Sequence, residues 1–387
     1  MVRIRPFNPY IFADNIVNVI SPPFDSISEE LESRLKQSEH NITHLTLPET
    51  HTDPGEILDR WISEGVLQRL PGSQYVILDQ TYSTGESCRL TGIVALANIF
   101  PDDGSIMPHE KTFPRPISER IRIMKAASAQ LEPVYLFVDS SGLESMLRSI
   151  ISDREPGMEF VDLSGVHNRV YFCNDAEAGG VADLLAGIPA VVADGHHRTA
   201  ASRELAIRSS GEEKEFWSWI MAYIVPLNSS GLKISGIHRY VDTTGLKNSM
   251  PGWRSSLIET HDGRTDSRLL AVYDGEWHTV SPSSETCSEN ADACLSPVHT
   301  LNSLILESGF GFTDCDFQDR VSYTHSEEEA VRKVDAGLAN FAAVIPDWDK
   351  NSLMGLILNR GYLPQKSTYF YPKPPSGMFI NALRPHP

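Results

Sequence analysis

The chain has 387 residues and a formal net charge of −18, from 51 acidic residues against 33 lysines and arginines. A nucleic-acid partner needs a basic surface, so this balance argues against nucleic acid as the main ligand. The length allows one large hydrophobic core or two.

Cysteine usage and hydropathy bear on where the protein works. Five cysteines without a Cys-x-x-Cys pair indicate a reducing compartment. No apolar run of the sequence has the length of a membrane span, and no signal-peptide apolar stretch follows Met1-Val2-Arg3-Ile4-Arg5. We therefore expect a cytoplasmic protein with no membrane partner.

The first 70 residues alternate short extended and helical patterns. The run 17–20 predicts a strand that the prolines of Pro22-Pro23-Phe24-Asp25 end. These prolines aim Asp25 either at a ligand site or into a rigid loop that closes the core. A capping box, Ser26-x-x-Glu29, predicts a helix, 44–48 predicts a second strand, and 54–67 predicts a second helix.

Two long strand patterns follow and lead into a polar motif. The runs 75–82 and 90–97, joined by Ser83-Thr84-Gly85-Glu86, predict an antiparallel hairpin. After a turn at 103–104 comes Pro108-His109-Glu110-Lys111-Thr112, with four chemically active side chains in a row. Glu110 is a candidate general base and Lys111 a candidate phosphate contact, whereas a solvated loop is the alternative.

An alternation of helices and strands then leads to the most informative stretch. Helices are predicted over 117–127, 143–151 and 176–185, and strands over 133–138 and 170–172. Asp194-Gly195-His196-His197-Arg198 stands between a buried strand pattern, 190–193, and helical spacing from Ala200 onward. Gly195 permits a sharp turn, and a helix N-terminus presents free N–H groups to anions.

This motif predicts a phosphate-binding site at the start of a helix. Arg198 supplies a planar fork that suits two phosphate oxygens. Asp194 and the two histidines would lie beside the phosphate. The alternative is that Asp194 caps the helix and the histidines are surface residues.

The second half of the chain carries fewer signals. Extended segments are predicted over 221–225 and 232–237, and Arg239 just after them is a second candidate phosphate contact or an interface residue. A helix fragment at 253–257, a strand at 269–273 and a polar variable loop at 281–292 follow. Helix, strand and helix are predicted over 327–338, 339–346 and 352–359.

A polar and aromatic segment, 364–373, lies near the end. Its phosphate-competent donors are Lys366, Ser367, Thr368 and Lys373. The aromatic residues between them, 369–371, can stack on a nucleobase or fill a core. We expect this segment to run back across the chain and complete the site, with an edge strand protected by lysines as the alternative.

These motifs resemble those of known proteins. Asp194-Gly195-His196-His197-Arg198 resembles the signature of the ParB/sulfiredoxin-like superfamily, which includes ParB, sulfiredoxin and free serine kinases. With 22–25, 108–112 and 364–373, the whole chain resembles the domain-of-unknown-function family numbered 1015, which also shows an arginine where Arg120 stands. The resemblance implies a mixed α/β nucleotide-binding core over 1–240, an insertion or second lobe over 241–330, and a C-terminal segment, 331–387, that completes the site.

The resemblance also implies an activity. It suggests a phosphotransferase that uses ATP or ADP with Mg²⁺ on a small hydroxyl compound such as free serine, or the reverse reaction on phosphoserine. Glu110, His196, His197 and Asp194 would act catalytically, and Asp194 with Asp25 would hold Mg²⁺. The expected nucleotide-binding residues are Gly195, Arg198, Thr199, His109, Lys111, Lys366, Ser367, Thr368, Lys373 and Arg239.

Other functions compete with this one. The first is a nucleotide switch that binds and slowly hydrolyses CTP, as in ParB, although no basic DNA-reading segment is present. A structural metal site at the histidines ranks last, because no third histidine has suitable spacing. The family usually continues Arg-Tyr-Glu-Thr-Ala, whereas this chain has Thr199 and Ala200 in place of the aromatic and the acid. If those positions contact the substrate, we expect this chain to use another substrate than family members with the usual motif.

Overall fold

The computed structural model describes residues 2–13, 16–100, 103–110, 114–246, 253 and 255–383. The chain forms two compact units, one made of Met1–Leu232 with Pro372–Pro387 and one of Lys233–Tyr371. The division between these units thus falls after Leu232 and after Tyr371. None of the helices in the described part of the chain is long and apolar enough to cross a membrane.

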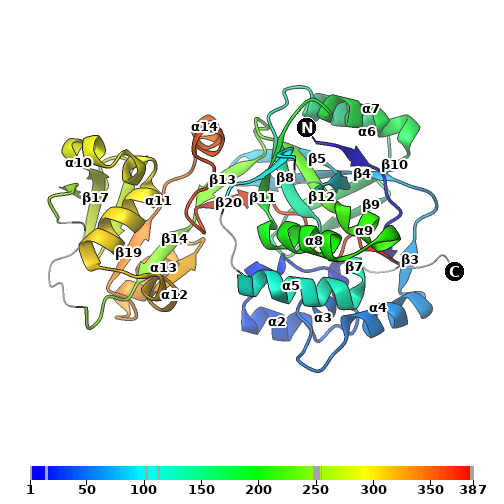
Figure 1. The fold of residues 1–387 in the computed structure, drawn as a ribbon, viewed down its shortest axis with the longest axis horizontal. Coiled ribbons are helices and arrows are strands. Elements are labelled where there is room, and N and C mark those ends of the chain that lie inside the picture. Colours follow the sequence, from blue (N-terminus) through cyan, green and yellow to red (C-terminus); the bar gives the residue numbers. More distant parts are fainter. Residues whose placement is uncertain are drawn as a thin grey trace. The chain divides into compact units, whose positions relative to one another are not determined.

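The first unit is built on a mixed sheet of nine strands (Figure 1). Their spatial order is β6 (Ile106–Pro108), β11 (Ala190–Asp194), β8 (Val134–Val138), β12 (Trp219–Pro226), β5 (Ser87–Asn98), β4 (Tyr75–Ser83), β10 (His167–Cys173) and β9 (Met158–Val161), with β1 (Ile4–Arg5) beside β5. The β6–β11 and β8–β12 pairs are parallel, and the other pairs are antiparallel. The fold is therefore mixed α/β.

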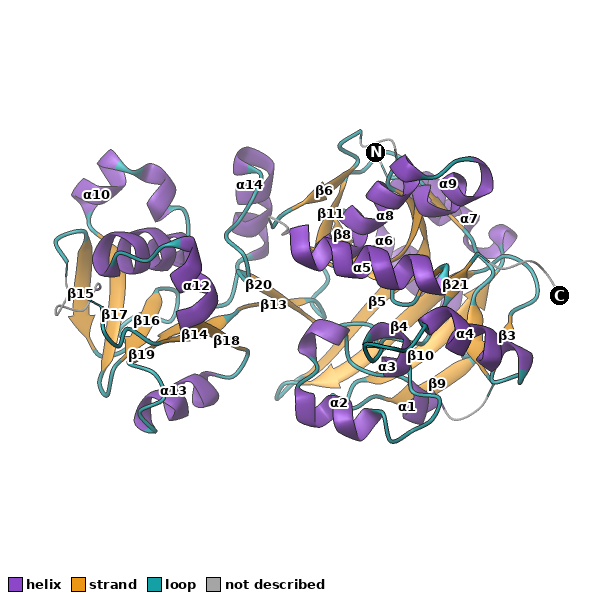
Figure 2. Cartoon of the chain, turned by 60° about the horizontal axis from the view of Figure 1, so that its bottom comes forward, coloured by secondary structure: helices purple, strands orange, loops and turns teal. Residues whose placement is uncertain are grey.

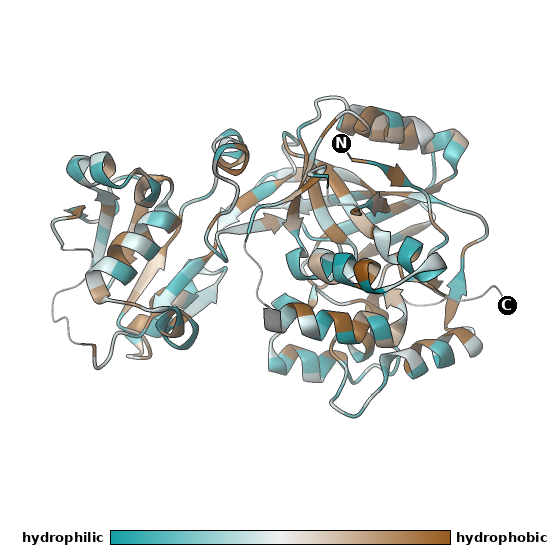
Figure 3. Cartoon of the chain, viewed as in Figure 1, coloured by the Kyte–Doolittle hydropathy of each residue, from teal (hydrophilic) through white to brown (hydrophobic). Residues whose placement is uncertain are grey.

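Helices cover the two faces of this sheet. On one face, α6 (Leu143–Ile151) and α7 (Asp175–Leu185) share a core with the apolar strand residues. On the other, α5 (Pro114–Ala127), α8 (His196–Arg208) and α9 (Gly211–Ser218) pack through a smaller cluster around Trp217. The hydropathy of the central strands and their covering helices can be followed in Figure 3. The remaining elements of this unit are β2 (Tyr10–Phe12), β3 (Leu67–Arg69), β7 (Ala129–Gln130), β21 (Asn381–Ala382), α1 (Ile16–Val19), η1 (Phe24–Ser26), α2 (Glu29–Leu35), α3 (Thr43–Thr46) and α4 (Pro54–Ser63).

The second unit has its own sheet and core (Figure 2). Its six strands run in the order β15 (Ile258–Asp262), β17 (Trp277–Pro282), β16 (Leu270–Tyr273), β19 (Phe341–Val344), β14 (His238–Val241) and β18 (Val321–Thr324). A separate ladder pairs β13 (Lys233–Gly236) with β20 (Thr368–Tyr371). Its helices are α10 (Ser284–Glu289), η3 (Ala291–Cys294), α11 (Pro297–His299), η4 (Thr300–Phe310), α12 (Asp314–Arg320), α13 (Glu327–Asp335) and α14 (Lys350–Arg360).

The 75–97 hairpin is as predicted. The helix predicted after a Ser26 capping box is α2, but Ser28 and not Ser26 is its N-cap. Three further local expectations are wrong. The segments predicted as strands at 17–20 and 44–48 are the short helices α1 and α3, and the predicted loop at 281–292 contains the end of β17 and α10. Local polar contacts explain two of them. Asn41 Oδ1 accepts from the backbone N–H of Thr43 at 3.1 Å, and Ser283 Oγ accepts from the N–H of Thr286 at 3.2 Å. Such contacts start helical turns regardless of β-branched content.

Candidate functional site

The junction of β11 and α8 places the polar motif at the end of a buried strand. Residues 190–193 are buried, and the strand ends at Asp194. Gly195 follows with φ 91°, a left-handed conformation that side chains disfavour. An added Cβ at Gly195 would lie 2.9 Å from Val134 Cγ1, so the close approach to β8 also requires glycine. Gly195 is the N-cap residue of α8 and has no side chain to cap the helix, whose N-terminus is the positive end of its dipole.

Asp194 holds two cationic side chains. Its Oδ2 accepts from Arg198 Nη2 at 2.8 Å, and its Oδ1 accepts from Lys373 Nζ at 2.9 Å. Burial alone would raise the pKa of Asp194, but Lys373 and Arg198 outweigh it, and the pKa is strongly lowered. Asp194 is therefore an ionised anchor that presents Lys373 and Arg198 beside the helix N-terminus.

Arg198 is only 8% exposed and is also tied to the segment before β8. Its Nη1 donates to the carbonyl of Pro133 at 2.7 Å and lies 3.6 Å from Glu132 Oε2, while its Nε has no partner. The neighbouring Thr199 is buried, and its hydroxyl donates to the carbonyl of Gly195 at 3.1 Å. Thr199 therefore serves the helix backbone in this arrangement.

The parallel pairing of β6 with β11 brings the second sequence motif to the first. His109 is fully buried; its Nδ1 contacts the carbonyl of Val192 and lies 3.2 Å from His196 Nε2. The backbone N–H of His109 donates to the same His196 Nε2 at 3.4 Å. His196 Nε2 thus accepts from this N–H, which assigns it as the unprotonated nitrogen and leaves the proton of the neutral ring on Nδ1.

Both of these histidines are held neutral. Burial lowers the pKa of His109, and it lowers the pKa of His196 well below its usual value with a further contribution from His109. Glu110, half-buried, has its Oε1 at 3.7 Å from His109 Nε2. A carboxylate, two neutral imidazoles and the helix start are thus grouped at one edge of the sheet. His197 is half-buried on the first turn of α8, and Lys111 lies outside the described residues.

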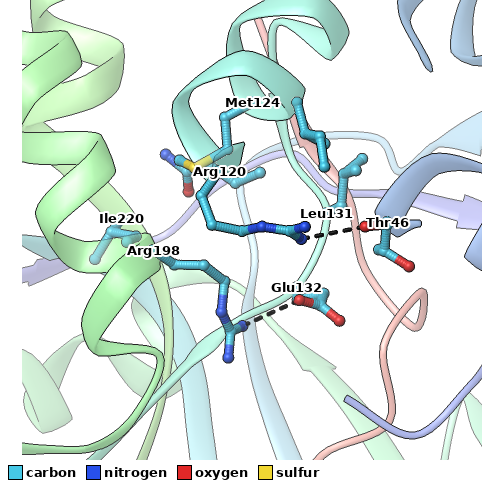
Figure 4. Close-up of a pocket in the computed structure, with 9 residues that line it drawn as sticks. Thr46, Arg120, Met124, Leu131, Glu132, Arg198 and Ile220 are labelled. Atoms are coloured by element: carbon cyan, nitrogen blue, oxygen red, sulfur yellow. Dashed lines mark hydrogen bonds and ion pairs between the residues drawn. The ribbon is translucent and has the colours of Figure 1, made fainter. Parts of the chain in front are cut away.

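A pocket opens beside this group, between α5, α3 and the segment before β8 (Figure 4). It measures about 380 Å³ including the solvent at its mouth, and its polar lining comes chiefly from Arg120, Arg198 and Glu132. A smaller adjoining pocket shares Glu132 and Arg198 and is lined also by Asp194 and Lys373. Arg198 therefore links the helix N-terminus to the larger pocket.

Glu132 was missed by sequence reasoning. It is 6% exposed and accepts hydrogen bonds from Ser376 Oγ and, at 3.4 Å, from the N–H of Phe24. Arg120 stacks on the Phe24 ring at 4.0 Å, so the proline motif packs beside this pocket. The one available signal was an acidic residue directly before a buried strand. Its partners come from both ends of the chain, which sequence order hides.

Four predicted phosphate contacts belong to the second unit. Arg239, 1% exposed, donates to the carbonyls of Ile237, Gln365 and, at 3.0 Å, Lys366. Ser367 is buried and its hydroxyl donates to the carbonyl of Pro364, while Thr368 pairs with Gly236 in the β13–β20 ladder. In this structure these contacts stabilise the loop before β20.

The predicted Mg²⁺ pair has a different setting from the one expected. Asp25 is exposed in η1, and both Asp194 oxygens are paired with cationic side chains. Within the described ranges, no group of three or more His, Cys, Asp or Glu side chains could hold a metal ion. A Mg²⁺ ion on Asp194 would have to displace Lys373 or Arg198, so this arrangement does not fit one.

Comparisons with known proteins give weak structural similarities and one family. The comparison with curated proteins gave no match. Similar solved structures include a conserved hypothetical protein from Pyrococcus furiosus (11% identity, TM-score 0.38, 72% of this chain and 92% of that one), a free serine kinase in complex with AMP (12%, 0.38, 69% and 83%), and C-terminally truncated SbnI from Staphylococcus aureus (8%, 0.43, 74% and 87%). The family model described as "Protein of unknown function (DUF1015)" matches residues 4–302, and the chain belongs to this family.

Proposed function

We propose that the first unit is a nucleotide-dependent phosphotransferase acting on the hydroxyl of a small metabolite. The acceptor oxygen attacks the terminal phosphorus of ATP or ADP, the bond to the bridging oxygen breaks, and the acceptor proton passes to a base. The shorter nucleotide leaves. Free serine is the first acceptor to test. The same groups could also serve phosphoserine hydrolysis, in which water attacks the phosphorus and serine leaves.

The observation that carries the proposal is the pair of cations at the start of α8. Lys373 and Arg198 are anchored on Asp194 beside the uncapped N-terminus that Gly195 creates. Positive groups at a helix N-terminus suit a transferring phosphoryl group, for which positioning and charge stabilisation supply most of the catalysis.

Glu110 is our candidate for the base that takes the acceptor proton. It lies beside His109, which contacts His196 at the start of α8, so a carboxylate and the phosphate site are close together. The neutral His196 can donate from Nδ1 to a phosphoryl oxygen. The 194–198 motif resembles that of the ParB/sulfiredoxin-like superfamily, whose free serine kinases use a glutamate as the base on the substrate hydroxyl. This resemblance supports Glu110 as the base. Any Mg²⁺ would arrive on the nucleotide phosphates, since Asp194 is already paired.

Thermal-shift titration tests the proposal. ATP, ADP, CTP, serine and phosphoserine are titrated with Mg²⁺ against the wild type, Arg198→Ala and Arg208→Ala. Arg208 is a matched control, because it lies on the same helix but pairs with Glu204 at its far end. A nucleotide at 100 times its Kd should stabilise the fold by about 2.7 kcal/mol.

We expect ATP or ADP to stabilise the wild type and Arg208→Ala but not Arg198→Ala. In a direct assay, the wild type should then phosphorylate serine with the nucleotide that binds. Binding of CTP alone, with no acceptor phosphorylated, would favour the nucleotide switch instead. No stabilisation by any nucleotide would overturn the proposal.

A further inference from the structure

The larger pocket of the first unit is lined by two buried arginine side chains. Arg120 is 5% exposed and Arg198 8%, and both line the pocket. Glu132 is the one carboxylate that the described lining supplies between them. Glu119, 3.4 Å from Arg120, has a side chain 57% exposed, so water screens its charge. Arg198 also pairs with Asp194, which Lys373 contacts as well, so the buried groups in and beside the pocket are three cations and two carboxylates. They carry one positive charge in excess.

The donors of these two arginines are not all used. Arg120 Nη1 donates to the carbonyl of Thr46 at 3.1 Å, and burial lowers the Arg120 pKa despite Glu132. Arg198 Nε is buried with no hydrogen-bond partner. A buried N–H without an acceptor is costly, so a ligand oxygen that accepts from it would be stabilised.

The charge and shape of the pocket select a class of anion. One excess positive charge matches a monoanion, whereas a phosphate dianion beside Glu132 would leave excess negative charge. The planar guanidinium fork suits a carboxylate. The other walls are largely apolar, formed by Ile123, Met124, Leu131 and Ile220.

We propose that this pocket is the acceptor site and that it recognises a carboxylate through Arg120 and Arg198. The inference rests on the proposed function and narrows it: the phosphoryl acceptor is a small hydroxy-carboxylate or hydroxy-amino acid. Arg198 then joins the two halves of the site, since it faces both the helix N-terminus and the carboxylate.

Paired ligands test this inference by calorimetric titration in the presence of ADP. Serine is compared with ethanolamine and glycerate with glycerol, because each pair differs by the carboxylate. The variants are Arg120→Gln, the pocket-filling Met124→Phe, and Arg122→Gln, an exposed arginine on the same helix, as control. Each variant is first shown to unfold cooperatively, since Arg120 also packs on Phe24.

We expect serine or glycerate to bind at least tenfold more tightly than its partner, as removing a charged hydrogen bond predicts. Arg120→Gln and Met124→Phe should abolish that difference with ADP affinity unchanged, and Arg122→Gln should have no effect. Equal affinities within both ligand pairs would overturn the inference. Loss of ADP affinity in Arg120→Gln would also overturn it, because the pocket would then bind phosphate. Carboxylate binding without any nucleotide binding would instead contradict the phosphotransferase and leave the carboxylate site standing.

Discussion

Lys373 donates a hydrogen bond from Nζ to Asp194 Oδ1 at 2.9 Å, although 179 positions separate the two residues in the sequence. This contact joins the C-terminal segment to the end of β11. Both side chains are largely buried, with 11% and 18% of their surfaces exposed. The pair therefore connects the tail to the candidate site and fixes the position of one of its two cations.

Lys373→Met should destabilise the first unit and weaken nucleotide binding. Breaking a buried pair by removing one partner costs up to 3–5 kcal/mol, but Arg198 still neutralises Asp194, so we expect about 1–3 kcal/mol. Urea unfolding at pH 7, where the lowered pKa keeps Asp194 ionised, measures the change. Lys125→Met, at an exposed position of α5, is the control. Equal stabilities of the two variants would show that the pair contributes little.

Stability should fall as the pH drops below about 6.5, the pKa of an unfolded histidine. The folded protein holds His109 and His196 neutral with lowered pKa values, so the unfolded chain binds more protons in this range. Each such histidine adds a slope of up to about 1.4 kcal/mol per pH unit below 6.5, and none above it. His109→Gln should reduce the slope of the free energy of unfolding against pH by up to about 1.4 kcal/mol per pH unit, the contribution of one proton. His51→Gln, an exposed site, should leave it unchanged, and parallel curves for all three proteins would refute the assignment.

Arg239→Met should destabilise the second unit without changing nucleotide affinity. Its guanidinium donates to three carbonyls, so the substitution leaves buried acceptors unsatisfied at a cost of about 2–4 kcal/mol. Thermal unfolding and ADP titration are measured against Arg332→Met, an exposed control on α13. A loss of ADP affinity with unchanged stability would instead restore the phosphate role that the sequence suggested for Arg239.

Sequence patterns located the parts of the first unit that depend on near neighbours. The β4–β5 hairpin and the β11–α8 junction were predictable, because alternation, a turn and a glycine are local signals. The strand predicted at 44–48 failed for a local reason as well, since the Asn41 side chain starts α3.

The network around Glu132 could not be predicted in the same way. Its partners Phe24, Arg198 and Ser376 come from the beginning, middle and end of the chain. Tertiary contacts of this kind leave no periodic signal. Similarly, nothing in the sequence distinguishes Arg239, which serves buried carbonyls, from an arginine that binds phosphate.

Gly195→Ala should damage the site more than a glycine replacement at a comparable backbone conformation elsewhere. Gly195 has φ 91°, and its added Cβ would meet Val134 at 2.9 Å and Arg198 Nη2 at 3.1 Å. Gly165 has φ 78° with nothing within 4 Å of an added Cβ. Gly165→Ala therefore reports the cost of the left-handed conformation alone, about 1–2 kcal/mol, whereas Gly195→Ala adds the clash.

The difference between these two variants isolates the effect of crowding at the helix start. We expect Gly195→Ala to lose at least 1 kcal/mol more in urea unfolding than Gly165→Ala, because β8 is rigidly packed beneath Gly195. It should also displace the Arg198 guanidinium from Asp194 and so reduce nucleotide affinity, which Gly165→Ala should preserve. If Gly195→Ala binds ADP as the wild type does, the cradle formed by Gly195, Arg198 and Lys373 is not the nucleotide site.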